Sequence, residues 1–141
     1  NFMITFSFSA VVKGTKEKAW FYYENLEQWY RWESDLEDIC LDGAFETGVS
    51  GTMTLSGMPP LAFNLVKVVD QHSFTDISET PAGSILFEHD IIEGETGFIT
   101  LKHSVSLVCE EPSDEQVNFL KQVFADVPSS VLTLKDIVEK E

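Results

Sequence analysis

The sequence has little positive charge. It holds nine Lys and Arg against 24 Asp and Glu, which gives the 141 residues a formal net charge of −15 at pH 7. A surface of this charge repels phosphate backbones and anionic lipid headgroups, because binding to either depends on neutralising negative charge with Lys and Arg. The composition therefore argues against a nucleic-acid partner, and we interpret the dispersed acidic residues as a solvated surface.

Long hydrophobic runs and cysteines are also scarce. No run is long enough to span a bilayer, and no basic stretch leads into an apolar one as in a secretory signal. We therefore expect no stable membrane insertion and a cytoplasmic protein. The two cysteines, Cys40 and Cys109, lack metal-ligand spacing. We interpret them as buried thiols, and a disulfide stays open as the alternative.

Motifs that mark several chemistries are missing. The segment Gly48-Val-Ser-Gly51 lacks the register and the following helix of a nucleophile elbow, and there is no glycine-rich phosphate loop. The three histidines do not show metal-ligand spacing on a shared face. We therefore expect neither a metal nor a cofactor.

Alternating apolar residues predict strands along most of the chain. Phe2 to Ala10 alternate with period two, which is typical of a half-buried antiparallel strand. Thr15 is expected to cap a helix that runs to about Leu26, with a short helical turn at 28–31 after it. Six further strands are predicted at 36–42, 50–56, 61–70, 72–80, 84–93 and 97–109. Their short connections indicate an antiparallel meander.

The last segment has helical periodicity. Apolar residues at 117, 120, 124, 127, 131, 134 and 138 predict one helix over 113–139, capped by Ser113 and kinked by Pro128 near Phe124. Such a helix would be roughly 40 Å long, about the length of the strand at 97–109. We predict an α+β fold in a single domain, 1–141, with about seven antiparallel strands curved around this helix. The space between sheet and helix is the natural cavity.

The order of these elements and four motifs resemble a known superfamily. The motifs are Trp29-x-x-Trp32, Leu41-x-Gly-x-Phe-x-x-Gly48, Phe87-x-His89 and Thr100-x-x-His103-x-Val105. Together they are similar to the START/polyketide-cyclase superfamily (SRPBCC), whose members have the helix-grip fold. The superfamily includes aromatase/cyclases, hormone-binding members, lipid carriers and co-chaperone domains. The resemblance therefore implies the fold without selecting an activity.

Two histidines are the candidate catalytic residues. Apolar neighbours at alternate positions place His89 and His103 on the apolar faces of their strands. If the hairpin between these strands centres on Thr96, the two residues lie directly opposite each other. Facing the cavity, the imidazoles could act as acid and base or hold a polar ligand group. The alternative is a pair of buried histidines that bond to each other, to Tyr or to water.

Aromatic and aliphatic residues are expected to line the cavity. Trp32 is predicted to plug one end of it and Trp29 to lie nearer the opening. The expected ligand-binding residues are Trp29, Trp32, Phe63, Phe74, Phe87, Val105, Leu120 and Phe124. Arg31 is expected to pair with Glu27 or Asp35, in preference to clamping an anionic ligand.

Three functions follow from this reading. The first is binding of a small hydrophobic molecule, aromatic, polyketide-like or lipid-like, by a monomer or homodimer. The second is a cyclase/dehydratase-type enzyme in which His89 and His103 supply the acid-base groups. The third is a protein-interaction domain of the co-chaperone kind, whose cavity would be closed.

Overall fold

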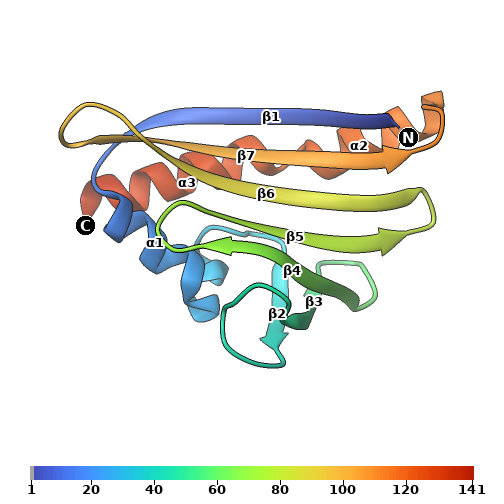
Figure 1. Cartoon of the computed structure of the whole chain (residues 1–141), viewed down its shortest axis with the longest axis horizontal. Coiled ribbons are helices and arrows are strands. Elements are labelled where there is room, and N and C mark those ends of the chain that lie inside the picture. Colours follow the sequence, from blue (N-terminus) through green and yellow to red (C-terminus); the bar gives the residue numbers. More distant parts are fainter. Residues whose placement is uncertain (1) are drawn as a thin grey trace.

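Seven antiparallel strands form one sheet in the computed structural model, which describes residues 2–141. The spatial order of the strands is β1-β7-β6-β5-β4-β3-β2, so β1 and β2 are the edges (Figure 1). The strands are β1 (Phe2–Lys13), β2 (Leu36–Leu41), β3 (Ser50–Leu55), β4 (Leu61–Val69), β5 (Ser73–Thr80), β6 (Gly83–Glu93) and β7 (Phe98–Cys109). From Leu36 to Cys109 the predicted strands agree with these bounds to within one residue at each end.

Two short helices follow β1. Helix α1 spans Lys16–Glu24 and the 3₁₀ helix η1 spans Leu26–Arg31. The hydroxyl of Thr15 accepts a hydrogen bond from the backbone N–H of Lys18 at 3.2 Å, which confirms the predicted N-cap. The chain therefore turns back to the sheet through a compact helical connection.

The Trp29-x-x-Trp32 motif caps the end of α1. The last carbonyls of a helix have no partner within it. The indole N–H of Trp29 donates to the carbonyl of Tyr23 at 2.7 Å, and that of Trp32 donates to the carbonyl of Tyr22 at 3.0 Å. Two large side chains thus fill the core and also satisfy two buried backbone acceptors.

The C-terminal helical region, predicted as one helix over 113–139 with a kink at Pro128 near Phe124, is divided at that point into two helices. Helix α2 spans Asp114–Phe124 and α3 spans Val127–Lys140. Pro128 lies in the first turn of α3, where its missing N–H costs no helical bond. Its ring would clash with the carbonyl of Phe124, four residues earlier, if the helix were continuous. The predicted Ser113 cap is confirmed, with Gln116 completing a capping box.

Helices α2 and α3 follow one another along the length of β1 and β7, behind the sheet as drawn (Figure 1). We call the face of the sheet that packs against the helices the inner face. Its large core cluster contains residues of α1, η1 and α3 together with Phe74 and Leu101. A second cluster contains Ile85, Val105 and Leu107 of the sheet and Leu120 of α2. None of the helices in residues 2–141 is long and apolar enough to cross a membrane.

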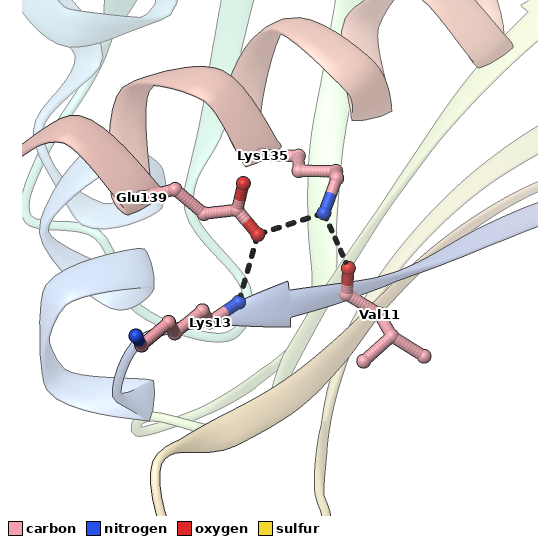
Figure 2. A network of polar contacts seen from close by, with 4 residues as sticks. All are labelled: Val11, Lys13, Lys135 and Glu139. Carbon is pink, nitrogen blue, oxygen red and sulfur yellow. Dashed lines mark hydrogen bonds and ion pairs between the residues drawn. The ribbon is translucent and has the colours of Figure 1, made fainter.

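A polar network fixes α3 on the edge strand β1 (Figure 2). The ammonium of Lys135 donates to the carbonyl of Val11 at 2.8 Å and pairs with Glu139 at 2.7 Å. The same carboxylate accepts the backbone N–H of Lys13 at 2.9 Å. The C-terminal half of α3 is thus tied to the sheet, and its first turn is left to border the cavity described below.

The cysteines differ from the prediction in one respect. Both are free, and Cys109 is buried as expected, but Cys40 is exposed. Cys40 lies on the edge strand β2, between Ile39 and Leu41, which are both half-buried. Because side chains alternate along a strand, Cys40 faces away from the core.

Candidate ligand-binding cavity

A cavity of about 320 Å³ lies between the inner face of the sheet and the break between α2 and α3. Its apolar walls include Leu55, Phe87, Val105, Phe119, Val123 and Val127. Its polar lining includes Glu33, Asp35, His89, His103, Asp126 and Ser130. Asp35 and Asp126 are exposed, so they mark the side on which the cavity meets solvent.

Two other hollows, of about 400 and 460 Å³, lie at the turns where strands end. One is bordered by the Gly94–Gly97 turn and the other by the Pro81–Gly83 turn. Neither contains a residue that the sequence predicts to be catalytic or ligand-binding. The cavity of 320 Å³ is therefore the candidate site.

The structure brings four of the ten predicted site residues together at this cavity. They are His89, His103, Phe87 and Val105. The core holds Trp29, Trp32, Phe63, Phe74 and Leu120, all buried and outside the cavity lining. Phe124 is half-buried and packs against Phe6, with ring centroids 5.7 Å apart.

The two tryptophans are equally enclosed. Trp29 is 4% exposed and Trp32 is 2% exposed, so Trp29 does not lie nearer an opening. Their rings lie 5.4 Å apart, and Trp29 also stacks against Phe74 at 5.5 Å. The bonds of both indoles to α1 explain this burial, because each N–H reaches a backbone carbonyl beneath the surface.

The histidines face each other as the hairpin predicted. His89 of β6 pairs directly with His103 of β7, and their ring centroids lie 4.7 Å apart at an interplanar angle of 71°. The ring of His89 stacks on Phe74 at 3.9 Å, and its Nδ1 lies 3.3 Å from the carbonyl oxygen of Phe74. Because a carbonyl only accepts, Nδ1 carries the proton and Nε2 presents a lone pair.

His103 has a tyrosine partner. Its Nε2 lies 2.7 Å from the hydroxyl of Tyr23, a bond in which either group can donate. Burial lowers the pKa of His89 to about 3, and burial together with His89 lowers the pKa of His103 well below its ordinary value. Burial raises the pKa of Tyr23. All three groups are therefore uncharged at neutral pH.

Glu33 contributes a carboxyl group to the cavity lining. It was not identified as a site residue from the sequence. The hydroxyl of Ser130 donates to its Oε1 at 2.7 Å. Burial raises the pKa of Glu33 to about 7; the Ser130 bond acts against this rise, and Asp35 and Asp126 add to it. The contact joins the connection after η1 to the first turn of α3, a pairing that no local pattern could predict.

Asp76 was missed as well. It lies directly across from Phe87 in the pairing of β5 and β6, so both side chains project from the inner face. The residue is 2% exposed, and its Oδ1 has no hydrogen-bond partner among residues 2–141. Burial, with the charge of Glu33 as the second cause, raises the pKa of Asp76 to about 8. The strand pattern offered a signal, because Asp76 follows Phe74 by two residues and shares its face.

Ser78 extends the same line of polar groups. It lies across from Ile85 on the inner face, and its hydroxyl also lacks a partner among the described residues. At the cavity's exposed side, a hydrogen bond with Asp35 raises the pKa of Asp126. The unpartnered groups of Asp76 and Ser78 thus lie on the inner face but outside the cavity lining, whereas Asp35 and Asp126 belong to the lining itself.

The prediction for Arg31 was wrong. Its guanidinium pairs with Glu141 at 3.4 Å and lies 5.4 Å from the ring centroid of Tyr22, in place of contacts with Glu27 or Asp35. Arg31 is not part of the cavity lining. Within residues 2–141, no group of three His, Cys, Asp or Glu is placed to hold a metal ion.

Sequence comparison and structure comparison give different results. No protein-family model and no curated protein sequence matches the chain. The structure is similar to a Staphylococcus aureus protein of unknown function, SA2116, with a TM-score of 0.75, 11% identity, and coverage of 99% of this chain and 96% of that one. It is also similar to Ara h 8.0201, with a TM-score of 0.72, 12% identity, and coverage of 99% and 100%.

Norcoclaurine synthase from Thalictrum flavum is a third similar structure, in complex with dopamine and hydroxybenzaldehyde. The TM-score is 0.74 at 10% identity, and the match covers 99% of this chain and 88% of that one. Identities this low carry the fold and no activity. The chain therefore shares the fold of these structures, and its seven-stranded antiparallel sheet curved around the C-terminal helices is the helix-grip fold that the sequence predicts.

Proposed function

We propose that the chain binds a small, largely apolar molecule with one polar group in the cavity between the sheet and the α2–α3 break. The observation that carries the proposal is the cavity itself, 320 Å³ in volume. Ligand pockets usually measure about 300–1,000 Å³. A volume at the lower end of that range suits a molecule of one or two rings.

The walls favour an apolar body. Phe87 and Val105 project from the sheet, and Phe119, Val123 and Val127 approach from the helices. An aromatic ring buries about 150–250 Å² in such a place, which at about 25 cal/mol per Å² contributes roughly 4–6 kcal/mol before the cost of association. We therefore expect modest affinity from the apolar body and orientation from the polar lining.

A likeness of fold gives this proposal limited support. The norcoclaurine synthase structure contains dopamine and hydroxybenzaldehyde, both of which are single-ring molecules. The example is consistent with a helix-grip chain of this size enclosing a small aromatic molecule. At 10% identity it does not transfer a ligand or a reaction to this chain.

Calorimetric titration with a panel of single-ring and two-ring alcohols tests the proposal. We expect saturable binding to the wild type. The substitution Val123→Phe places a ring in the cavity from the helix side and should abolish that binding. Leu132→Phe is the matched control, because Leu132 is exposed on α3 and lies outside the lining. Equal binding by both variants, or no binding by the wild type, would contradict the proposal.

An enzyme of the cyclase/dehydratase type is the second candidate. The observation in its favour is that two uncharged imidazoles line the cavity together with Glu33, whose pKa is about 7, and share the inner face with Asp76, whose pKa is about 8. Proton donors and acceptors near neutral pH are what acid-base catalysis requires. In this reading Glu33 or Asp76 supplies protons near neutral pH, and the neutral histidines, whose lowered pKa makes them weak bases, accept them.

Variants of the histidines separate the two candidates. In an enzyme, His89→Gln or His103→Gln would retain a bound ligand but lose its conversion, measured by mass spectrometry of the ligand after incubation. In a binding module, the wild type leaves the ligand unchanged. The third reading, a co-chaperone-like domain with a closed interior, is less favoured because it requires the 320 Å³ to be filled.

A further inference from the structure

The charged groups around the cavity all have the same sign. Four acidic residues belong to the lining, Glu33, Asp35, Glu88 and Asp126, and no Lys or Arg among residues 2–141 lines it. Arg31, two residues before Glu33, pairs with Glu141 and does not reach the lining. An anionic ligand would therefore meet repulsion without a compensating cation.

A buried carboxyl group without a partner, that of Asp76, is not itself in the cavity lining but lies directly across from the lining residue Phe87. Asp76 is enclosed on the inner face beside Phe87, its Oδ1 is unpaired, and the charge of Glu33 influences it. Native proteins rarely leave a buried polar atom unsatisfied unless a ligand or water completes it. Ser78, the next inner-face residue of β5, adds a second unpaired oxygen.

His89, on the same inner face as Asp76, is an uncharged hydrogen-bond acceptor and does not compete with a bound cation. The Nδ1–H of His89 donates to the carbonyl oxygen of Phe74, so the lone pair of Nε2 is available to accept a hydrogen bond. Its low pKa, about 3, keeps the ring uncharged in the presence of a cation. Carboxyl oxygens, a serine hydroxyl and an imidazole nitrogen together form a set of acceptors that suits a group rich in N–H donors.

We infer that the ligand is an organic cation, an amine whose apolar body packs between the sheet and α2 and whose ammonium group is held by Glu33 and Asp76. The inference rests on the proposed function and names its ligand class. An ammonium group donates up to three hydrogen bonds and neutralises the carboxylates, so it supplies the partner that Asp76 lacks.

Three probes with one shape test the inference. The probes are 4-phenylbutylamine, 4-phenylbutanol and 4-phenylbutyrate, which share an apolar body and carry a positive, a neutral and a negative group. Each is titrated calorimetrically into the wild-type protein at pH 7. We expect the amine to bind about tenfold to a hundredfold more tightly than the alcohol, the range for hydrogen bonds to charged groups. The butyrate should bind most weakly.

Neutral replacements locate the charged group. Glu33→Gln and Asp76→Asn should each weaken binding of the amine about tenfold more than they weaken binding of the alcohol. Asp70→Asn is the matched control, because it removes one negative charge at an exposed turn, whereas Asp76 is buried on the inner face. Equal losses in all three variants would show only a long-range effect of net charge and would overturn the inference.

A wild-type measurement guards against variants that fail to fold. A bound ammonium stabilises the ionised carboxylates, so binding at pH 7 should release protons, on the order of one in total. Titrations in buffers of different ionisation enthalpy measure this number. We expect release with the amine and none with the alcohol. Absence of release with the amine would overturn the inference.

The outcomes distinguish a failure of this inference from a failure of the proposed function on which it rests. If the alcohol binds as tightly as the amine, or the butyrate binds best, the cavity takes ligands of another class and the cation inference is wrong while the proposed function stands. If none of the three probes binds, the proposed function fails and the inference fails with it.

Discussion

The hydroxyl of Ser130 lies 2.7 Å from the Oε1 of Glu33, and this contact joins the first turn of α3 to the connection after η1. It lies at the cavity and affects the ionisation of Glu33, whose pKa it lowers against the effect of burial. The same hydrogen bond therefore holds α3 against the connection after η1 and influences the charge of the candidate site.

Replacing Ser130 should therefore change both properties. We expect Ser130→Ala to raise the pKa of Glu33 above its value of about 7, because the bond that stabilises the carboxylate is lost. The free energy of unfolding should fall by roughly 1–2 kcal/mol. Carbon-13 NMR titration of the Glu33 carboxyl and urea denaturation measure the two effects. The exposed neighbour, Ser129→Ala, should change neither; an unchanged Glu33 pKa in Ser130→Ala would contradict the assignment.

Stability should decrease as the pH rises from about 6.5 to 8. Asp76 has a pKa of about 8 in the folded protein against an ordinary value of 3.8, and Glu33 about 7 against 4.5. In this window the folded state keeps protons that the unfolded state has already lost. Raising the pH therefore costs stability, by up to about 1.4 kcal/mol per pH unit for each carboxyl group.

Below pH 6.5 the histidines act in the opposite direction. The unfolded chain protonates His89 near its ordinary pKa of 6.5, whereas the folded protein does so only near 3, so a falling pH costs stability. The two effects offset each other there, which leaves the interval above pH 6.5 as the test. Thermal unfolding should show a shallower decline for Asp76→Asn than for the wild type, and a higher melting temperature at pH 8. Parallel curves would contradict the prediction.

Tyr23 should stabilise the protein through His103. The substitution Tyr23→Phe keeps the ring but removes the hydroxyl that lies 2.7 Å from Nε2 of His103. A buried polar atom that loses its partner costs about 1–3 kcal/mol, which urea denaturation detects. Tyr30→Phe is the control, because Tyr30 is exposed. Equal stabilities of the two variants would mean that the Tyr23–His103 bond contributes nothing.

The Trp29-x-x-Trp32 motif should be required for stability more than for ligand binding. In Trp32→Phe the carbonyl of Tyr22 loses its indole donor and the core loses volume, so we expect a loss of roughly 2–4 kcal/mol. Binding of a cavity ligand by the folded fraction should remain, since Trp32 lies outside the lining. Calorimetry below the melting temperature measures this, and a specific loss of affinity with unchanged stability would contradict it.

The sheet and the histidine pair were predictable from the sequence because strand alternation and a short hairpin fix the register. Once β6 and β7 are joined by the turn ending at Gly97, His89 can face only a few positions, and the pairing with His103 follows. The position of the break between α2 and α3 was predictable as a kink at Pro128, but the full separation into two helices was not. The apolar stripe continues through Phe124 and Val127, so periodicity alone does not reveal it, although Pro128 marks its place.

The carboxyl groups at the site could not be assigned in the same way. Alternation places Asp76 beside Phe74, but its burial depends on how the helices and the η1–β2 connection cover the sheet. Glu33 reaches the cavity through a contact with Ser130, which is distant in sequence. Phe74 in the core and Phe87 in the cavity wall are equally hydrophobic, so hydrophobicity alone does not distinguish a core residue from a cavity-lining one.

The most direct test of the central claim is an amide chemical-shift titration of the labelled wild-type protein with 4-phenylbutanol and 4-phenylbutylamine. If the cavity binds small apolar molecules, saturable shifts should concentrate at Phe87, Val105, Phe119 and Val123 and disappear in Val123→Phe. Saturable shifts confined to other surfaces, or the absence of any saturable shift with either molecule, would contradict the account.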